Sequence, residues 1–150
     1  MKKVVKFGGS SLASAEQFQK VGEIIRADES RVYVVPSAPG KRFSDDTKVT
    51  DMLLHAYDLA SQGKDIAEQM AAIKARYMEI IEGLHLENFS LDEDFAIIEE
   101  QLRNYPQKDY TASRGEYLNG KIMAEYLGIE FIDAQDVIFF NEEGNLNPYK

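Results

Sequence analysis

The first stretch that could do chemistry is KFGGSS, from Lys6 to Ser11, in which a lysine lies close to two glycines and two serines. An ammonium group is costly inside a strand unless an opposite charge neutralises it, and adjacent glycines let the backbone approach another group closely. Successive backbone N–H groups in such a turn can converge on an oxyanion, and the hydroxyls of Ser10 and Ser11 can donate as well. We therefore predict that this stretch binds an anion, with Lys6 as a point charge on a phosphate.

The same stretch has a simpler interpretation, in which an edge-strand lysine reaches solvent above an ordinary Gly-Gly turn. The known glycine fingerprints do not decide between the two. GGSSLAS does not match G-x-G-x-x-G, and the chain contains no G-x-x-x-x-G-K-[ST]. A dinucleotide-binding or P-loop fold is therefore disfavoured.

The elements that would position this turn alternate between strands and helices. KKVVKF predicts a first strand, and the helix after it has Ser14 and Gln17 at capping-box spacing. RVYVVP predicts a second, buried strand that ends in the loop Ser37–Lys41. Ligands of parallel sheets bind at the carboxyl ends of the strands, so this loop and the glycine turn should lie at one edge.

The rest of the chain predicts further helices and a third strand. Pairs of residues at capping spacing mark several of the helix starts, namely Asp65 with Glu68, Ser90 with Glu93 and Ser113 with Glu116. The expected helices run from Thr47 to Ala60, from Asp65 to near Gly83, from Ser90 to Tyr105 and from Ser113 to Leu127, and IEFIDA is the expected strand. DVIFF starts as another apolar strand. The predicted fold class is α/β, with a mainly parallel sheet sandwiched by helices.

Composition limits the possible functions. A chain of 150 residues with 44% hydrophobic and 29% charged residues fits one globular domain or a large piece of one. Its formal charge of −9 and the lack of a basic segment disfavour a nucleic-acid partner. The chain has no cysteine and no apolar run of membrane-spanning length, so we expect a cytoplasmic protein without a membrane partner. His55 and His85 lack the spacing of metal ligands, so no metal site is predicted.

Five blocks in order, KFGGSSLAS, PSAPGK, TKVTDMLL, SRGEYLNGKIMAEYLG and FIDA, resemble the aspartate kinases of the amino-acid kinase superfamily. The resemblance covers nearly the whole chain, and the SRGE block favours aspartate over other substrates of that superfamily. It implies ATP- and Mg²⁺-dependent phosphorylation of the β-carboxylate of L-aspartate to 4-phospho-L-aspartate, the first step of lysine, threonine and methionine biosynthesis. It also implies a homo-oligomer in the full-length form.

The resemblance assigns roles to individual residues. Lys6 matches the lysine that contacts the transferring phosphoryl group, and Gly8, Gly9 and Ser10 match the loop beneath the ATP phosphates. Ser37 matches a serine that lines the cleft, although a plain turn serine is the alternative. Thr50 matches a threonine that hydrogen-bonds the substrate aspartate, although a solvated hydroxyl in the first turns of a helix is the alternative.

Glu116 has two competing interpretations. The resemblance places its carboxylate on the α-ammonium group of aspartate, a natural partner for that cation. Ser113-x-x-Glu116 is also a good capping box, in which the glutamate folds back on a backbone amide and contacts no ligand. We favour the substrate role, and the two roles could coexist because a carboxylate has two oxygens.

The chain also departs from the family pattern. Family members continue into a second half that supplies the adenine pocket, a catalytic aspartate and a substrate-binding arginine, and then into regulatory ACT domains. We therefore interpret residues 1–150 as the N-terminal portion of an amino-acid kinase catalytic domain that is inactive by itself. A non-catalytic fragment or regulatory partner that retains the fold, or a superfamily member acting on glutamate, acetylglutamate or a nucleotide, remains the alternative.

Overall fold

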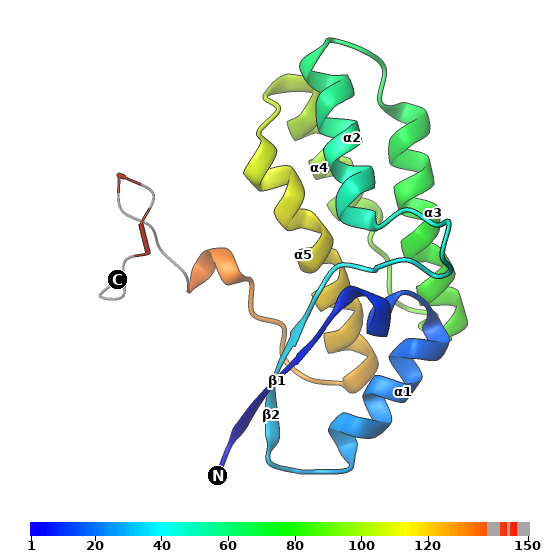
Figure 1. Cartoon of the computed structure of the whole chain (residues 1–150), viewed down its shortest axis with the longest axis vertical. Coiled ribbons are helices and arrows are strands. Elements are labelled where there is room, and N and C mark those ends of the chain that lie inside the picture. Colours follow the sequence, from blue (N-terminus) through cyan, green and yellow to red (C-terminus); the bar gives the residue numbers. More distant parts are fainter. Residues whose placement is uncertain (138–141, 144, 147–150) are drawn as a thin grey trace.

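The computed structural model describes residues 1–137, 142, 143, 145 and 146. Figure 1 shows a small pair of strands at the base of a group of helices. In chain order the elements are β1 (Lys3–Phe7), the 3₁₀ helix η1 (Gly9–Leu12), α1 (Ala15–Arg26), β2 (Arg31–Pro36), α2 (Val49–Ser61), α3 (Ala67–Gly83), α4 (Asp92–Asn104), α5 (Lys108–Leu127) and the 3₁₀ helix η2 (Ala134–Asp136). None of the helices in this described part is long and apolar enough to cross a membrane.

The strands β1 and β2 pair in parallel, with α1 as the connection between them. Lys6 lies opposite Val35 and Phe7 lies opposite Pro36, so both strands end at the same edge of the sheet. The pairing continues one step beyond the strands, because the Ser37 N–H donates to the Phe7 carbonyl at 3.1 Å. The turn after β1 and the loop after β2 are therefore neighbours, as the sequence predicted.

The two faces of the sheet have different surroundings. Val5, Phe7 and Val34 are partly buried and pack against the hydrophobic core. The residues beside them point the other way, and Val4 and Val35 are 67% and 46% exposed. The predicted α/β class is confirmed in an incomplete form, with one parallel strand pair and five α-helices in the described residues.

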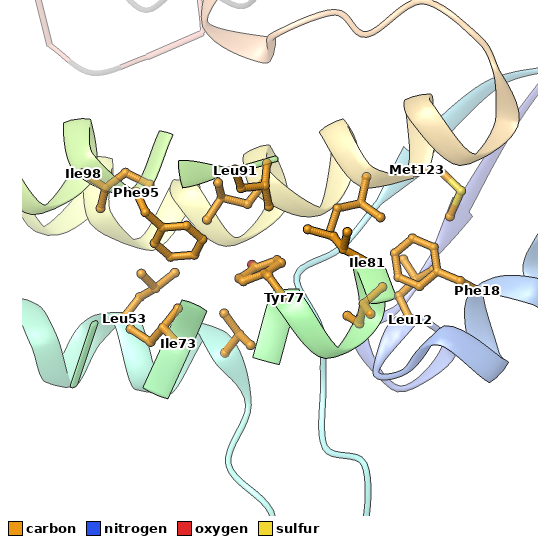
Figure 2. Packing of buried hydrophobic residues seen from close by; sticks show 14 of the residues in the cluster. Leu12, Phe18, Leu53, Ile73, Tyr77, Ile81, Leu91, Phe95, Ile98 and Met123 are labelled. Atoms are coloured by element: carbon orange, nitrogen blue, oxygen red, sulfur yellow. The ribbon is translucent and has the colours of Figure 1, made fainter. Parts of the chain in front are cut away.

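The core lies mainly among the helices. In Figure 2, Tyr77 of α3 lies in the middle of the cluster, and its ring meets that of Phe95 edge-on with centroids 5.8 Å apart. The predicted α3 stripe is confirmed, because its apolar side chains recur at helical spacing and are all buried: Ile66, Met70, Ile73, Tyr77, Ile80 and Ile81. This packing fixes α3 and α5 relative to the strand ends.

The predicted helix starts are partly correct. Ser14 caps α1, accepting a hydrogen bond from the Gln17 N–H at 3.3 Å. The start of α5 at Ser113 is wrong, because the helix begins at Lys108 with Gln107 as its N-cap. Ser113 lies inside the helix, and its hydroxyl donates to the Tyr110 carbonyl three residues earlier. The resemblance of this segment to a capping box therefore did not mark a helix start.

The third strand predicted for IEFIDA is also wrong. Residues 129–133 follow the C-cap Gly128 as irregular chain and lead into η2. Phe131 packs edge-on against Tyr117 of α5 with ring centroids 5.6 Å apart, so the segment contacts a helix instead of pairing with β1 or β2. A strand needs a hydrogen-bonded neighbour, which sequence periodicity alone does not supply. Most of the predicted DVIFF strand lies outside the described residues.

Candidate functional site

A cleft of about 430 Å³ lies at the carboxyl ends of β1 and β2. It collects side chains from the turn after β1, the loop after β2, the start of α2 and the middle of α5. The residues that line it are Gly9, Ser10, Ser37, Ala38, Pro39, Gly40, Lys41, Lys48, Thr50 and Glu116. Five of the residues predicted for the site therefore meet here, namely Gly9, Ser10, Ser37, Thr50 and Glu116.

The floor of this cleft is backbone packed on backbone. The Gly40 N–H donates to the Gly9 carbonyl at 2.8 Å, which joins the two loops directly. A Cβ added at Gly40 would lie 2.6 Å from the Gly9 carbonyl carbon, and one added at Gly9 would lie 3.0 Å from the Ala38 oxygen. Glycine at positions 9 and 40 thus allows the two loops to touch.

Gly8 differs from Gly9, because a Cβ at position 8 would meet nothing within 4 Å. Its φ of −76° is one that any residue can adopt. No contact within the described protein therefore requires glycine here. Gly8 precedes Gly9, which lines the cleft, and open space beside a backbone is what a phosphate group needs for close approach.

Lys6 is less enclosed than the sequence suggested. It is exposed on the face of β1 opposite to Val5 and Phe7, and it is not among the residues that line the cleft. In its exposure Lys6 matches the simpler interpretation of this stretch, in which an edge-strand lysine reaches solvent. Within the described residues Lys6 makes no ion pair, so its charge is available to a ligand.

Ser37 and Thr50 reach the cleft from β2 and α2. Ser37 is the residue directly after β2, and its carbonyl accepts a hydrogen bond from the Asn119 side chain on α5 at 2.8 Å. The Asn119 Oδ1 atom is buried and has no partner among the described residues. Thr50 is half-buried in the first turn of α2. Asn119 thus ties the end of β2 to the helix that carries Glu116.

Glu116 is exposed on α5 and has no hydrogen bond or ion pair within the described residues. The capping-box interpretation is excluded, because α5 begins eight residues before it, at Lys108. Its charge is close to the buried Tyr77, whose hydroxyl donates to the Gly115 carbonyl at 2.9 Å. Burial, and next the negative charge of Glu116, raise the pKa of Tyr77 well above its usual value. The carboxylate is therefore an unpaired anion at the cleft.

Sequence reasoning missed two basic residues of the cleft. Lys41 and Lys48 both line it, both are exposed, and neither makes an ion pair within the described residues. They flank a loop of six residues. Lys41 is the last residue of the predicted loop Ser37–Lys41, and Lys48 lies two residues before the predicted Thr50. Their position on either side of a short polar segment between a strand and a helix was the available signal.

A network of charged residues lies on the other side of this loop, around a second cleft of about 540 Å³. Arg42 donates to both oxygens of Asp46, at 2.7 Å and 3.1 Å, and to Glu79 at 3.0 Å. Hydrogen bonds from Arg42 hold the pKa of Asp46 well below its usual value. The buried Arg76 of α3 lies beneath this pair, with Nη1 3.6 Å from Asp46.

The first cleft can hold a small molecule with both charges. A bed of backbone groups and hydroxyls at Gly9, Ser10 and Ser37 suits oxyanions, and the two lysines add positive charge. The Glu116 carboxylate suits an ammonium group. No group of three or more acidic, histidine or cysteine side chains in the described residues could hold a metal ion.

The curated proteins that are similar in sequence to this chain include several aspartokinases. Bacillus subtilis aspartokinase 3 is 38% identical over an alignment of 155 positions, gaps included, that covers 95% of this chain and 34% of that protein. The chloroplastic aspartokinase 1 of Arabidopsis thaliana is 31% identical over 88% of this chain and 24% of its own length. The chain thus spans about a third or less of these relatives.

Solved structures agree with these sequence matches. The crystal structure of Clostridium acetobutylicum aspartate kinase matches with a TM-score of 0.91 and 44% identity, over 98% of this chain and 34% of that one. The E. coli aspartokinase III structure, a complex with aspartate and ADP, matches with a TM-score of 0.71 at 21% identity, which supports the fold alone. The model of the amino acid kinase family matches residues 1–147. This chain therefore belongs to the amino acid kinase family.

Proposed function

We propose that this chain is the aspartate- and phosphate-binding portion of an aspartate kinase, which phosphorylates the β-carboxylate of L-aspartate with ATP to give 4-phospho-L-aspartate. The observation that carries the proposal is the cleft itself. It brings the glycine turn after β1 together with an unpaired carboxylate, Glu116, and the hydroxyls of Ser37 and Thr50. The aspartate kinases among its relatives support the choice of substrate.

The residues of the cleft, together with Lys6 and Gly8 beside it, divide between the two substrates. Gly8, Gly9 and Ser10 would lie beneath the phosphates of the nucleotide, and the open space at Gly8 fits such a group. Lys6, with an unpaired ammonium group on the strand that leads into this turn, would meet the transferring phosphoryl group. ATP supplies that phosphoryl group.

The amino-acid substrate would lie toward α2 and α5. The Glu116 carboxylate would bind the α-ammonium group, and the Ser37 and Thr50 hydroxyls would hydrogen-bond its carboxylates. Phosphoryl transfer depends mainly on positioning and on neutralising negative charge, so fixed donors on rigid elements suit it. Mg²⁺ would arrive with the nucleotide, since this part of the chain offers no cluster of carboxylates for it.

A chimera tests the proposal. This chain would replace the matching segment of the Clostridium acetobutylicum aspartate kinase, with the unaltered enzyme as control. With Mg-ATP, L-aspartate and hydroxylamine, we expect the chimera to form the hydroxamate of an acyl phosphate. A folded but inactive chimera would overturn the proposed function. We expect the isolated chain to give no product, because it spans only about a third of the aspartate kinases that it matches.

Two variants of the chimera assign the roles. Lys6→Met should lower kcat far more than it raises KM for aspartate, because its charge acts on the transferring group. Glu116→Gln should raise KM for aspartate at least about tenfold, since a hydrogen bond to a charged group contributes about 1.5–3 kcal/mol. Unchanged kcat in the first variant, or unchanged KM in the second, would remove that residue from the site.

A further inference from the structure

One buried arginine holds both ends of the loop between β2 and α2. Arg76 on α3 is 4% exposed. Its Nη2 donates to the Gly40 carbonyl at 2.7 Å and its Nη1 donates to the Thr47 carbonyl at 2.8 Å. The planar guanidinium can reach two acceptors at once in a fixed geometry, which a lysine cannot do. Arg76 thus links Gly40 to Thr47, and we call these two positions the neck of the loop.

The backbone at the neck reinforces this closure. The Val49 N–H donates to the Pro39 carbonyl at 3.0 Å, next to the carbonyls that Arg76 binds. Inside the loop, Arg42 and Asp46 form the ion pair described above. The neck is therefore defined by one side chain of α3 and one backbone hydrogen bond.

The burial of the Arg76 guanidinium is energetically unfavourable. Burial, and next the positive charge of Arg42, lower its pKa, and its Nε atom is buried without a hydrogen-bond partner. Asp46 lies 3.6 Å from its Nη1, but a buried ion pair is weak evidence for net stability, so we explain Arg76 by the geometry that it specifies. The geometry that Arg76 specifies is the position of Gly40 and Thr47.

The residues after these two carbonyls are the two lysines of the first cleft. Lys41 follows Gly40, and Lys48 follows Thr47. Both line the cleft while Arg76 contacts the opposite side of the loop, where it lines the second cleft. The same clamp therefore fixes the backbone from which both lysine side chains enter the cleft, whose lining also includes Ser10 and Glu116.

We infer that Lys41 and Lys48 form an oxyanion subsite of this cleft, and that Arg76 is the positioning residue that preorganises it. The ligand is an anionic oxygen group of a substrate, either a phosphoryl group or a carboxylate. In a chain of net charge −9, these two unpaired lysines are the positive charges that line the cleft. The inference deepens the proposed function and rests on it for the identity of the substrates.

Titration of the isotope-labelled chain with inorganic tripolyphosphate or with L-aspartate tests the subsite by NMR. We expect the backbone amides of Lys41 and Lys48 to shift with at least one ligand, and the ligand that shifts them identifies the group bound. The double variant Lys41→Gln/Lys48→Gln should bind that ligand on the order of tenfold more weakly. Lys20→Gln/Lys64→Gln is the matched control, because it removes two exposed lysines elsewhere.

Arg76→Lys tests the positioning role while keeping the charge. We expect faster hydrogen exchange at the Gly40 and Val49 amides, affinity reduced more than about threefold, and unchanged exchange in α4. In the Lys41→Gln/Lys48→Gln background, Arg76→Lys should have no further effect on affinity, because it acts through those lysines. A merely structural role would weaken binding equally in both backgrounds.

Several results would overturn the inference. The subsite is refuted if neither ligand shifts Lys41 or Lys48, or if the lysine double variant binds as well as the matched control. The role of Arg76 is refuted if Arg76→Lys keeps full affinity, or if its effect is additive. Failure of the proposed function is separate, because it appears as an inactive chimera whether or not the isolated chain binds the anion.

Discussion

The variant Gly40→Ala tests the contact between the two loops of the cleft. The added methyl group would lie 2.6 Å from the Gly9 carbonyl carbon, 2.8 Å from the Ser10 nitrogen and 2.9 Å from the Gly9 oxygen. All three atoms belong to the backbone, so no flexible side chain can move aside. We therefore expect the two loops to separate.

The size of the effect follows from two losses. Forcing an extra methyl group into packed surroundings costs about 1–3 kcal/mol. Separation also weakens the 2.8 Å hydrogen bond from the Gly40 N–H to the Gly9 carbonyl, and such a bond contributes about 0.5–1.5 kcal/mol. Together these give a loss of about 1.5–4.5 kcal/mol in the free energy of unfolding, a large part of a typical stability of about 5–15 kcal/mol.

Gly8→Ala is the matched control, one residue away from the contact. Its methyl group would meet nothing within 4 Å, and its φ of −76° suits alanine. Replacing glycine at a compatible position lowers the entropy of the unfolded chain and stabilises a protein by about 0.4–1 kcal/mol. Gly8→Ala should therefore unfold at an equal or higher urea concentration than the unaltered chain.

Urea titration followed by far-UV circular dichroism measures both variants. We expect the two glycine-to-alanine substitutions to change the free energy of unfolding with opposite signs. If Gly40→Ala unfolds within about 0.5 kcal/mol of the unaltered chain, the loop contact is not as tight as described. If Gly8→Ala loses more than about 1 kcal/mol, the space beside Gly8 is not open.

Three further variants test other features of the site. Tyr77→Phe removes the hydroxyl that donates to α5, so it should lower the free energy of unfolding by about 1 kcal/mol, and an unchanged urea midpoint would contradict that hydrogen bond. Hydrogen bonds from Arg42 lower the folded-state pKa of Asp46 below the usual 3.8, so the carboxylate stabilises the fold above that pH and this stabilisation is lost as pH falls further. Asp46→Asn should therefore be less stable than the unaltered chain near neutral pH and lose less stability below about pH 4. An equal loss of unfolding free energy in the two proteins as the pH falls would contradict this. Glu116→Gln should change the free energy of unfolding by less than about 0.5 kcal/mol, because the side chain is exposed and unpaired, and a larger loss in urea titration would indicate a structural role.

Local pattern determined the elements nearest to the site. Ser14 and Gln17 predicted the start of α1, and the buried stripe of α3 followed from its helical spacing, because a cap and an amphipathic face depend on residues only a few positions apart. The parallel order of β1 and β2, with their loops at one edge, followed from the strand-helix-strand pattern. The sequence thus indicated where the cleft should be and five of the ten residues that line it.

Tertiary structure decided what local pattern could not. Ser113 and Glu116 have the spacing of a capping box, yet α5 already extends through them, and this alone frees the Glu116 carboxylate for a ligand. Residues 129–133 have an apolar pattern like a strand, but Phe131 packs on α5 instead. In the second case a packing contact with a helix outweighed the local preference.

The arrangement of the cleft's charges also depended on contacts distant in sequence. Arg76 clamps the Gly40 carbonyl from 36 positions further along the chain, and Asn119 binds the Ser37 carbonyl from 82 positions away. Periodicity and spacing report on neighbours within a few turns of the chain, so they cannot indicate such partners. The sequence by itself predicted which groups bind a phosphate and an amino acid. Only the contacts of α3 and α5 with the loop after β2 decided that Lys41 and Lys48 line the cleft, and Lys6 remains outside its lining.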